Sequence, residues 1–256
     1  AQPEVVFHLA AQPLVRESYA QPAATFAANV MGTVNLLEAV RKTPSVRFVI
    51  VVTTDKCYDN REWVYGYRES DPLGGHDPYS ASKAAAEIAT AAWRSSFFDA
   101  AGVGVATVRA GNVIGGGDFA PDRLLPDFVR AIERNAELTI RSPNAVRPWQ
   151  FVLEPLRGYL EIAERGLQRE PGLASAWNFG PDESSVRTVR QVIDGFSKAT
   201  AWREPPRVNY GATTQQPHEA TLLKLDTSKA RARLAWEPRL NLSATLALTA
   251  DWYRGW

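Results

Sequence analysis

Residues 48–58, FVIVVTTDKCY, pass abruptly from apolar to polar side chains. The first five carry no polar group, which is typical of a strand buried on both faces of a parallel sheet. Two hydroxyls, a carboxylate, an amine and a thiol follow at once. In open parallel sheets, ligands bind outside the carboxyl ends of the strands. The stretch therefore predicts a rigid buried strand whose polar tip faces a substrate.

Strands and helices alternate around this stretch. Residues 4–11 (EVVFHLAA) predict a short apolar strand, and apolar positions at helical spacing predict a helix over residues 22–42. A second helix is expected to begin at Asp77-Pro78 and to run to about residue 100. A third strand follows in GVGVATVRAGNV. This order predicts an α/β fold, a Rossmann-like doubly wound parallel sheet with helices on both faces.

The chain changes character after Asn112, where a Gly-rich loop and short mixed elements begin. We expect residues 1–112, with about 149–180, to form a nucleotide-binding sheet domain. Residues 113–148 and 181–256 are expected to form a smaller C-terminal substrate-binding lobe. The sequence contains no internal repeat and no low-complexity linker that would indicate further domains.

Charge and cysteine content exclude several classes of partner. The 29 basic and 28 acidic residues are spread along the chain without a basic block, so neither nucleic acid nor an anionic membrane surface is indicated. Cys57 is the single cysteine, which excludes an internal disulfide and fits a reducing, cytoplasmic location. His8, His76 and His218 lie far apart, and no metal site is expected. No apolar run is expected to reach the length of a membrane span.

Tyr79 and Lys83 lie four residues apart in the expected second helix, so their side chains leave the same face one turn apart. A nearby ammonium favours the phenolate and would lower the pKa of the tyrosine, which could then accept an alcohol proton. Thr54, at the strand tip, could hydrogen-bond the same substrate oxygen. This arrangement suits the oxidation of a secondary alcohol by a nicotinamide cofactor. The alternative is a half-buried ring beside a solvated amine, but the motifs that surround the pair favour catalysis.

Seven segments carry a family resemblance: FHLAAQPLVRESY, NVMGTVNLLEAVR, TTDKCYDN, YSASK, RAGNVIGGGDFAPDRLLPD, RPWQFVLEPLRGYL and PHEATLLKLD. The chain resembles the extended short-chain dehydrogenase/reductase family, and within it the sugar-nucleotide 4,6-dehydratases, from residue 3 to the last helix. The similarity is greatest to the branch that acts on CDP-glucose. It implies NAD as cofactor, a lyase activity that yields CDP-4-keto-6-deoxyglucose, and a place in the deoxysugar biosynthesis that supplies lipopolysaccharide O-antigen.

The resemblance implies a catalytic triad of Thr54, Tyr79 and Lys83 and a dehydratase pair of Asp55 and Lys56. Relatives that act on dTDP-glucose carry Asp-Glu at the pair, and the CDP-glucose branch carries Asp-Lys. In the implied reaction a hydride leaves C4 of the hexose for NAD⁺, water is eliminated across C5 and C6, and the hydride returns to C6. Asp55 is expected to protonate the departing C6 hydroxyl, which requires a raised pKa, and Lys56 to remove the C5 proton, which requires a lowered pKa. The alternative for this pair is a solvated loop.

The resemblance also implies cofactor and substrate contacts. The residues implied for the cofactor are Ala10, Ala11, Asn29, Thr53, Tyr79 and Lys83. Those implied for the sugar nucleotide are Gln12, Arg16, Ser18, Asn112, Arg123, Arg147, His218 and Glu219. Arginine suits a diphosphate because its planar fork donates two parallel hydrogen bonds. The alternatives are a surface charge for each arginine and an ordinary polar helix residue for Asn29.

Two features depart from the family pattern. No G-x-x-G-x-x-G or G-x-G-x-x-G occurs in the sequence, and relatives have three further strands before the position of Val5. We therefore expect the chain to be N-terminally incomplete, and to bind NAD poorly if it begins at Ala1. Phe151 stands where relatives tend to have histidine, which removes an expected polar contact near RPWQFV.

Rival functions share much of this site. A 4-epimerase, or a dehydratase for a GDP- or dTDP-sugar, would use the same fold, although Asp55-Lys56 argues against the epimerase. A non-catalytic dinucleotide or sugar-nucleotide binder would need none of these proton-transfer groups.

Relatives associate through the helices at residues 29–40 and 79–93, so a homodimer is expected. Burial of the same face within one chain is the alternative.

Overall fold

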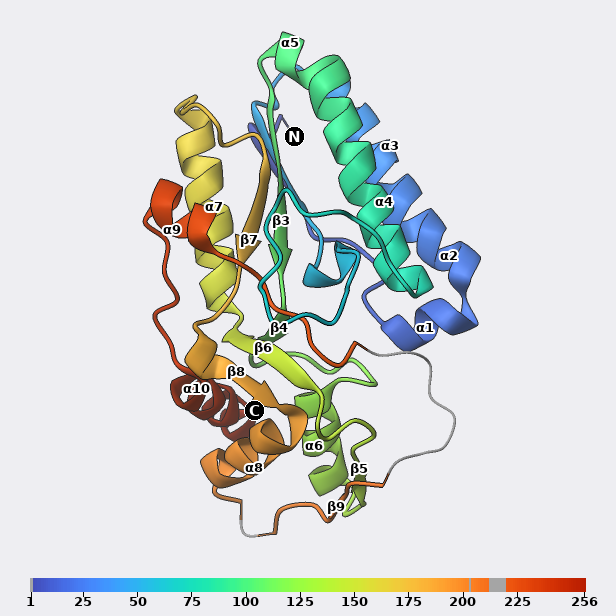
Figure 1. Cartoon of the computed structure of the whole chain (residues 1–256), viewed down its shortest axis with the longest axis vertical. Coiled ribbons are helices and arrows are strands. Elements are labelled where there is room, and N and C mark those ends of the chain that lie inside the picture. The colour runs from blue at the N-terminus through green and yellow to red at the C-terminus, as the bar shows by residue number, and fades with distance from the viewer. Residues whose placement is uncertain (1, 203, 212–219) are drawn as a thin grey trace.

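The structure, a computed structural model, describes residues 2–202, 204–211 and 220–256. A four-stranded parallel sheet forms its centre, in the order β1 (Val5–His8), β2 (Phe48–Val52), β3 (Gly104–Ala110) and β7 (Ala176–Phe179). Because the strands are parallel, their carboxyl ends share one edge, which faces the lobe in the lower half of Figure 1. The predicted α/β fold with a parallel sheet is confirmed.

Helices cover both faces of this sheet (Figure 1). One face is covered by α2 (Pro22–Phe26), η1 (Ala27–Met31), α3 (Gly32–Arg41) and α4 (Pro78–Trp93), and the other by α7 (Leu153–Leu167) and α9 (Ser228–Leu234). In β2, Phe48 and Ile50 pack in the core beneath α7 and α9, whereas Val49 and Val51 pack in the core beneath α3. Side chains of a strand point to alternate faces, so a strand without polar residues needs an apolar layer on each side. β2 has both.

The second predicted helix begins at Asp77. Its carboxylate caps α4 by accepting hydrogen bonds from the Ser80 amide at 3.0 Å and the Ser80 hydroxyl at 2.5 Å, and Pro78 takes the first helical position. The helix continues through η3 (Arg94–Phe98) and α5 (Asp99–Ala101) to Gly102, whose φ of 69° ends it. The predicted helix over residues 22–42 is present as α2, η1 and α3 in succession.

The lobe is built on a second sheet. β4 (Asn112–Ile114) runs parallel to β6 (Val146–Phe151), which pairs antiparallel with β8 (Val186–Thr188). The predicted third strand is therefore divided at Gly111 between two sheets. A Cβ at Gly111 would lie 2.7 Å from the Pro148 side chain and 3.2 Å from Asp55 Oδ2, so a larger residue does not fit where the chain crosses.

Helices α6 (Leu124–Glu133), α8 (Val189–Thr200) and α10 (Leu242–Gly255) enclose the core of the lobe. The smaller elements are α1 (Val15–Ala20), β5 (Leu138–Thr139), β9 (Val208–Asn209), η2 (Asp55–Cys57) and η4 (Glu183–Ser185). Part of the predicted lobe lies elsewhere, because α9 and Trp236 belong to the core of the four-stranded sheet. The Trp236 ring lies 4.9 Å from that of Phe179, and its indole N–H donates to the Glu154 carbonyl oxygen at 3.2 Å. The other domain boundaries stay a prediction.

The helical stretch Pro22–Arg41 is long and apolar enough, by length and composition alone, to cross a membrane. The expectation that no such stretch occurs was therefore too strict. In the structure the stretch packs against α4, and its buried positions include Thr25, Asn29 and Thr33. The polar groups of these three side chains are hydrogen-bonded within the protein. The stretch is a covering layer of the sheet.

Two helical glycines test the packing of these layers. Gly158→Ala in α7 is expected to lower the free energy of unfolding by about 1–3 kcal/mol, because the new Cβ would lie 2.2 Å from the buried ring of Phe179. Gly32→Ala in α3 is the matched control, since nothing lies within 4 Å of its Cβ position. It should stabilise the protein by about 0.5–1 kcal/mol through helix propensity. Urea denaturation measures both, and an equal loss in the two variants would contradict the assigned packing.

Candidate active site

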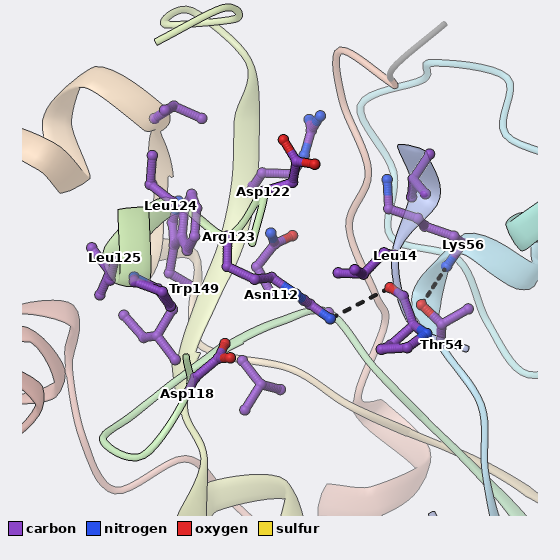
Figure 2. A pocket seen from close by; sticks show the side chains of 18 of the residues that line it. Leu14, Thr54, Lys56, Asn112, Asp118, Asp122, Arg123, Leu124, Leu125 and Trp149 are labelled. Carbon is purple, nitrogen blue, oxygen red and sulfur yellow. Dashed lines mark hydrogen bonds between the residues drawn. The ribbon is translucent and has the colours of Figure 1, made fainter. Parts of the chain in front are cut away.

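A cavity of about 400 Å³ lies between the carboxyl end of the four-stranded sheet and the lobe. Its volume suits a small-molecule ligand. Figure 2 shows Thr54 and Lys56 on the sheet side and Asn112, Asp118 and Arg123 on the lobe side. The sheet and the lobe each supply one wall. The cavity thus lies outside the carboxyl ends of the strands, where parallel sheets of this kind bind ligands.

The turn η2 brings Asp55 and Lys56 to this cavity together. Thr54 caps the turn, because its hydroxyl accepts the Lys56 amide at 3.3 Å and donates to Asp55 Oδ1 at 3.1 Å. Neighbouring residues of a strand point to opposite sides, but a 3₁₀ turn sets them only roughly 120° apart. Both side chains line the cavity, with Thr54 and Tyr79. The two side chains thus reach one cavity, and the role of the pair stays a prediction.

Asp55 is buried, with 3% of its surface exposed, beside the crossing point at Gly111. Its Oδ2 atom has no hydrogen-bond partner among the described residues. Burial raises the pKa of Asp55, although the charge of Lys56, the hydrogen bond from Thr54 and the charge of Arg147 oppose the shift. A buried carboxyl group with a raised pKa and an unbonded oxygen beside a cavity is suited to donate a proton to a ligand.

Tyr79 and Lys83 lie one turn apart on α4, but the ammonium is directed at the main chain. Lys83 Nζ donates to the Val52 carbonyl oxygen at 3.2 Å, at the end of β2. Burial raises the pKa of Tyr79 to about 12, although a hydrogen bond with Thr54 acts to lower it. The sequence had led us to expect a lowered pKa. Burial also lowers the pKa of Lys83 to about 8, against the charge of Glu87. Because the strand-end carbonyl holds the ammonium, burial dominates the pKa of the phenol.

Asn29, in the π-helical turn η1, joins the end of β1 to α4. Its amide donates to Ser82 Oγ at 2.9 Å and to the Gln12 carbonyl oxygen at 3.1 Å, and its Oδ1 accepts the Gln12 amide at 2.7 Å. Turns of this kind occur often at functional sites. Ala10 and Ala11 precede this contact on a partly exposed chain segment after β1. These contacts give the predicted supporting role of Asn29 a physical basis.

The structure brings together only some of the predicted substrate residues. Those that line the cavity are Arg16, Asn112, Arg123 and Arg147. Gln12 and Ser18 do not line it, and their assignment to the substrate stays a prediction. The polar groups of Gln12 bond to the chain around it, and Ser18 is fully buried and bonds within α1. His218 and Glu219 lie outside the described residues.

Sequence reasoning missed four charged residues that line the cavity, Asp118, Asp122, Asp127 and Arg141. Asp122 accepts hydrogen bonds from Arg16 at 3.2 Å and from Arg141 at 3.3 Å, so it connects the two walls. Its φ of 58° is uncommon for a residue with a side chain. The stretch GGGDFAPD predicted a loop here but gave no signal for which acids face the cavity.

A tyrosine and a lysine one turn apart on a helix, beside the carboxyl end of a parallel sheet, are the arrangement of the short-chain dehydrogenase/reductase class. Within this class, residues 1–249 match the family model described as GDP-mannose 4,6 dehydratase, and the chain belongs to that family. The chain is 50% identical over 260 residues to the CDP-glucose 4,6-dehydratase of Salmonella typhimurium (strain LT2). This alignment covers 100% of this chain and 72% of that protein.

Solved structures of related proteins have the same fold. MoeE5 in complex with UDP-glucose and NAD is 27% identical, with a TM-score of 0.85 over 98% of this chain and 79% of that one. The UDP-glucose 4-epimerase of Thermotoga maritima, with UDP-glucose, is 26% identical, with a TM-score of 0.83 over 99% of this chain and 78% of that one. The predicted resemblance is confirmed at the level of family and fold.

Removing the Asp55 charge is expected to stabilise the protein. The folded-state pKa is raised above the unfolded value of about 3.9, so the carboxylate disfavours folding increasingly as pH rises from that value through the folded-state pKa. Asp55→Asn should therefore gain stability over the wild type, more at pH 7 than at pH 4, in urea denaturation. Asp59→Asn, at a half-exposed acid after η2, is the control and should change stability little. A less stable Asp55→Asn protein at pH 7 would refute the assigned environment.

Proposed function

We propose that this chain acts as a CDP-glucose 4,6-dehydratase, an NAD-dependent hydro-lyase that converts CDP-glucose to CDP-4-keto-6-deoxyglucose. The observation that carries the proposal is the cavity shared by Thr54, Asp55, Lys56 and Tyr79, which has an acid, an amine and a phenol in its lining. The 50% identity to the Salmonella protein of that name extends over the whole chain. A cytoplasmic location, and a step in the supply of deoxysugars for lipopolysaccharide O-antigen, belong to the same proposal.

The residues present fit part of an NAD site. Lys83 has three ammonium donors, and among the described residues one of them is used, so two remain for the hydroxyls of a ribose. The small side chains of Ala10 and Ala11 permit close approach at the end of β1, while Asn29 and Thr53 hold the chain beside it. Bound there, NAD⁺ would supply the acceptor for a hydride from C4 of the sugar and its donor to C6. MoeE5, at 27% identity, carries NAD in its solved complex.

The side chains of the cavity supply the proton transfers. Tyr79 accepts the C4 hydroxyl proton, which requires the phenolate; burial opposes that form, and the hydrogen bond with Thr54 favours it. Asp55, whose pKa is raised by burial, donates a proton to the departing C6 hydroxyl. Lys56, half-buried on the same turn, takes the acidified C5 proton. Asn112 is placed to bond the sugar, and the guanidinium forks of Arg123 and Arg147 suit the diphosphate.

A sugar-nucleotide 4-epimerase is the second candidate, because the Thermotoga maritima relative carries that name. Epimerisation needs oxidation at C4 but no acid or base at C5 and C6. Incubation of the full-length protein with CDP-glucose and NAD⁺ separates the two. A 4-keto chromophore in alkali without net NADH supports the dehydratase, whereas interconversion of glucose and galactose configurations supports the epimerase. Binding without either product would support a non-catalytic binder.

Two substitutions should separate oxidation from elimination. Tyr79→Phe is expected to lower the rate of hydride transfer from C4 by a factor of about 10²–10⁴, because no group remains to accept the hydroxyl proton. Lys56→Ala should preserve that transfer and stall elimination, so that NADH accumulates in a single turnover. Exchange of the C5 proton with solvent deuterium measures the second step. Unchanged exchange in Lys56→Ala would show that another group is the base.

We also propose that two copies of the chain associate through the helical layer of α2, η1, α3 and α4. The exposed apolar side chains of this layer and of η3 are Phe26, Met31, Ile88 and Phe97, each between 39% and 59% exposed. Ile88→Glu should convert the dimer to a monomer in sedimentation at matched concentration. Leu160→Glu, on the outer side of α7 across the sheet, should leave the dimer intact. A dimer in both variants would exclude this face.

A further inference from the structure

Glu87 and Arg109 form a buried ion pair behind the cavity. Glu87 lies one turn beyond Lys83 on α4, Arg109 lies near the end of β3, and each is 3% exposed. Two hydrogen bonds join them, from Arg109 Nε to Glu87 Oε1 at 2.9 Å and from Nη2 to Oε2 at 2.8 Å. Burial alone would raise the pKa of Glu87, but the hydrogen bonds and charge of Arg109 hold it below its ordinary value. The pair is therefore ionised.

The remaining groups of the pair hold both ends of the turn η2. Glu87 Oε1 accepts a hydrogen bond from the Thr53 hydroxyl at 2.5 Å, and Thr53 directly precedes Thr54, the cap of the turn. Arg109 Nη1 donates to the Tyr58 hydroxyl at 2.7 Å, on the residue after the turn, and its guanidinium lies 4.9 Å from the Tyr58 ring centre. Residues 53 and 58 bracket the turn, and through Glu87 both are connected to α4.

Tyr58 extends this connection to β7. Its hydroxyl donates to Asn178 Oδ1 at 2.7 Å, and the Asn178 amide donates to the carbonyl oxygens of Tyr67 at 2.8 Å and Asp226 at 3.1 Å. Asn178 is fully buried. The network therefore joins β2, β3, β7 and α4 on the side of the turn that faces away from the cavity.

Stability alone does not explain this pair. Two charges lose their hydration on burial. A protein with apolar residues of similar volume in place of a buried ion pair is often equally stable. We propose that Glu87 and Arg109 are positioning residues, which hold the η2 turn in register with Tyr79 on α4, so that Asp55 and Lys56 meet the ligand that the phenol contacts. The inference rests on the proposed function, because it assigns the pair a role in the same site.

The carboxylate of Glu87 also acts on Lys83. Its charge opposes the burial that lowers the pKa of Lys83, and the other titratable groups whose charges act on Lys83 among the described residues are Cys57 and His8. Glu87→Gln should therefore lower the pKa of Lys83 further. The alkaline limb of the kcat profile, where the ammonium is lost, should move to lower pH.

The main test compares single and paired substitutions in the full-length protein. Arg109→Met leaves Glu87 buried without its partner and should lower the melting temperature strongly. Glu87→Met combined with Arg109→Met removes both charges and should recover most of that loss. The double variant should nevertheless show kcat reduced about 10²-fold with KM nearly unchanged, because a displacement of about 1 Å is enough for such a loss.

A milder pair of substitutions tests one end of the turn. Tyr58→Phe removes only the hydroxyl between Arg109 and Asn178, and should lower kcat by about tenfold with little change in melting temperature. Tyr67→Phe is the matched control. The Tyr67 ring stacks on Tyr58 with centres 5.0 Å apart, but its hydroxyl bonds elsewhere, so kcat should stay within about twofold.

Hydrogen exchange of the amides of residues 54–58 gives a readout independent of activity, and it should be faster in the double variant. Wild-type kcat in the folded double variant would overturn the inference and leave the proposed function intact. If the double variant does not fold, equal kcat in Tyr58→Phe and Tyr67→Phe would overturn it. If the wild type forms no 4-keto sugar, the proposed function fails, and unchanged exchange at residues 54–58 would then overturn the inference.

Discussion

The parallel pairing of β2 between β1 and β3 determines where the chemistry of this protein lies. Both faces of β2 are covered by apolar layers, so polar side chains are confined to the point where the strand ends. Just after β2, the Thr53 amide donates a hydrogen bond to the Val108 carbonyl oxygen of β3, at 2.8 Å. Because parallel strands end at one edge, the segments that follow β1 and β3 reach the same place. The tip of β2, the crossing at Gly111 and the chain after β1 therefore meet at this edge.

Burial then separates the roles of groups that are neighbours in the sequence. Asp55 is enclosed beneath Gly111, and its raised pKa favours the protonated form. Lys56, the next residue, is half-buried and lines the open part of the cavity. Pairs of titratable groups in contrasting environments are how proteins assign acid and base roles at one pH. The 3₁₀ turn permits this contrast because it directs two adjacent side chains to one cavity at different depths.

The periodic elements and the strand-end motifs were predictable from the sequence because each depends on local pattern. Apolar runs gave the strands, the Asp-Pro start gave α4, and TTDK at the end of an apolar run indicated a site. The division of the third strand at Gly111 was not predictable, because it depends on Pro148 and Asp55, which are distant in the chain. The burial of Ser18 and the place of α9 in the sheet core depend on such contacts too.

The pairing of Glu87 with Arg109 has a signal in the sequence. After Lys83, Glu87 is the remaining charged residue of α4, and Arg109 is the one charged residue of β3. Opposite charges in two otherwise apolar, buried elements indicate a buried pair, since an unpaired charge there would be costly. Ligand-binding motifs do not reveal the pair, because neither residue lines the cavity.

The segment that follows η2 also forms the contact between the sheet domain and the lobe. Glu62 accepts the amides of Thr221 at 2.8 Å and Leu222 at 2.6 Å, and the Tyr67 amide donates to the Lys224 carbonyl oxygen at 2.9 Å. The Thr221 carbonyl oxygen in turn accepts Arg147 Nη1 at 3.3 Å. One continuous stretch thus links the turn that carries the proposed acid and base to the arginine proposed for the diphosphate.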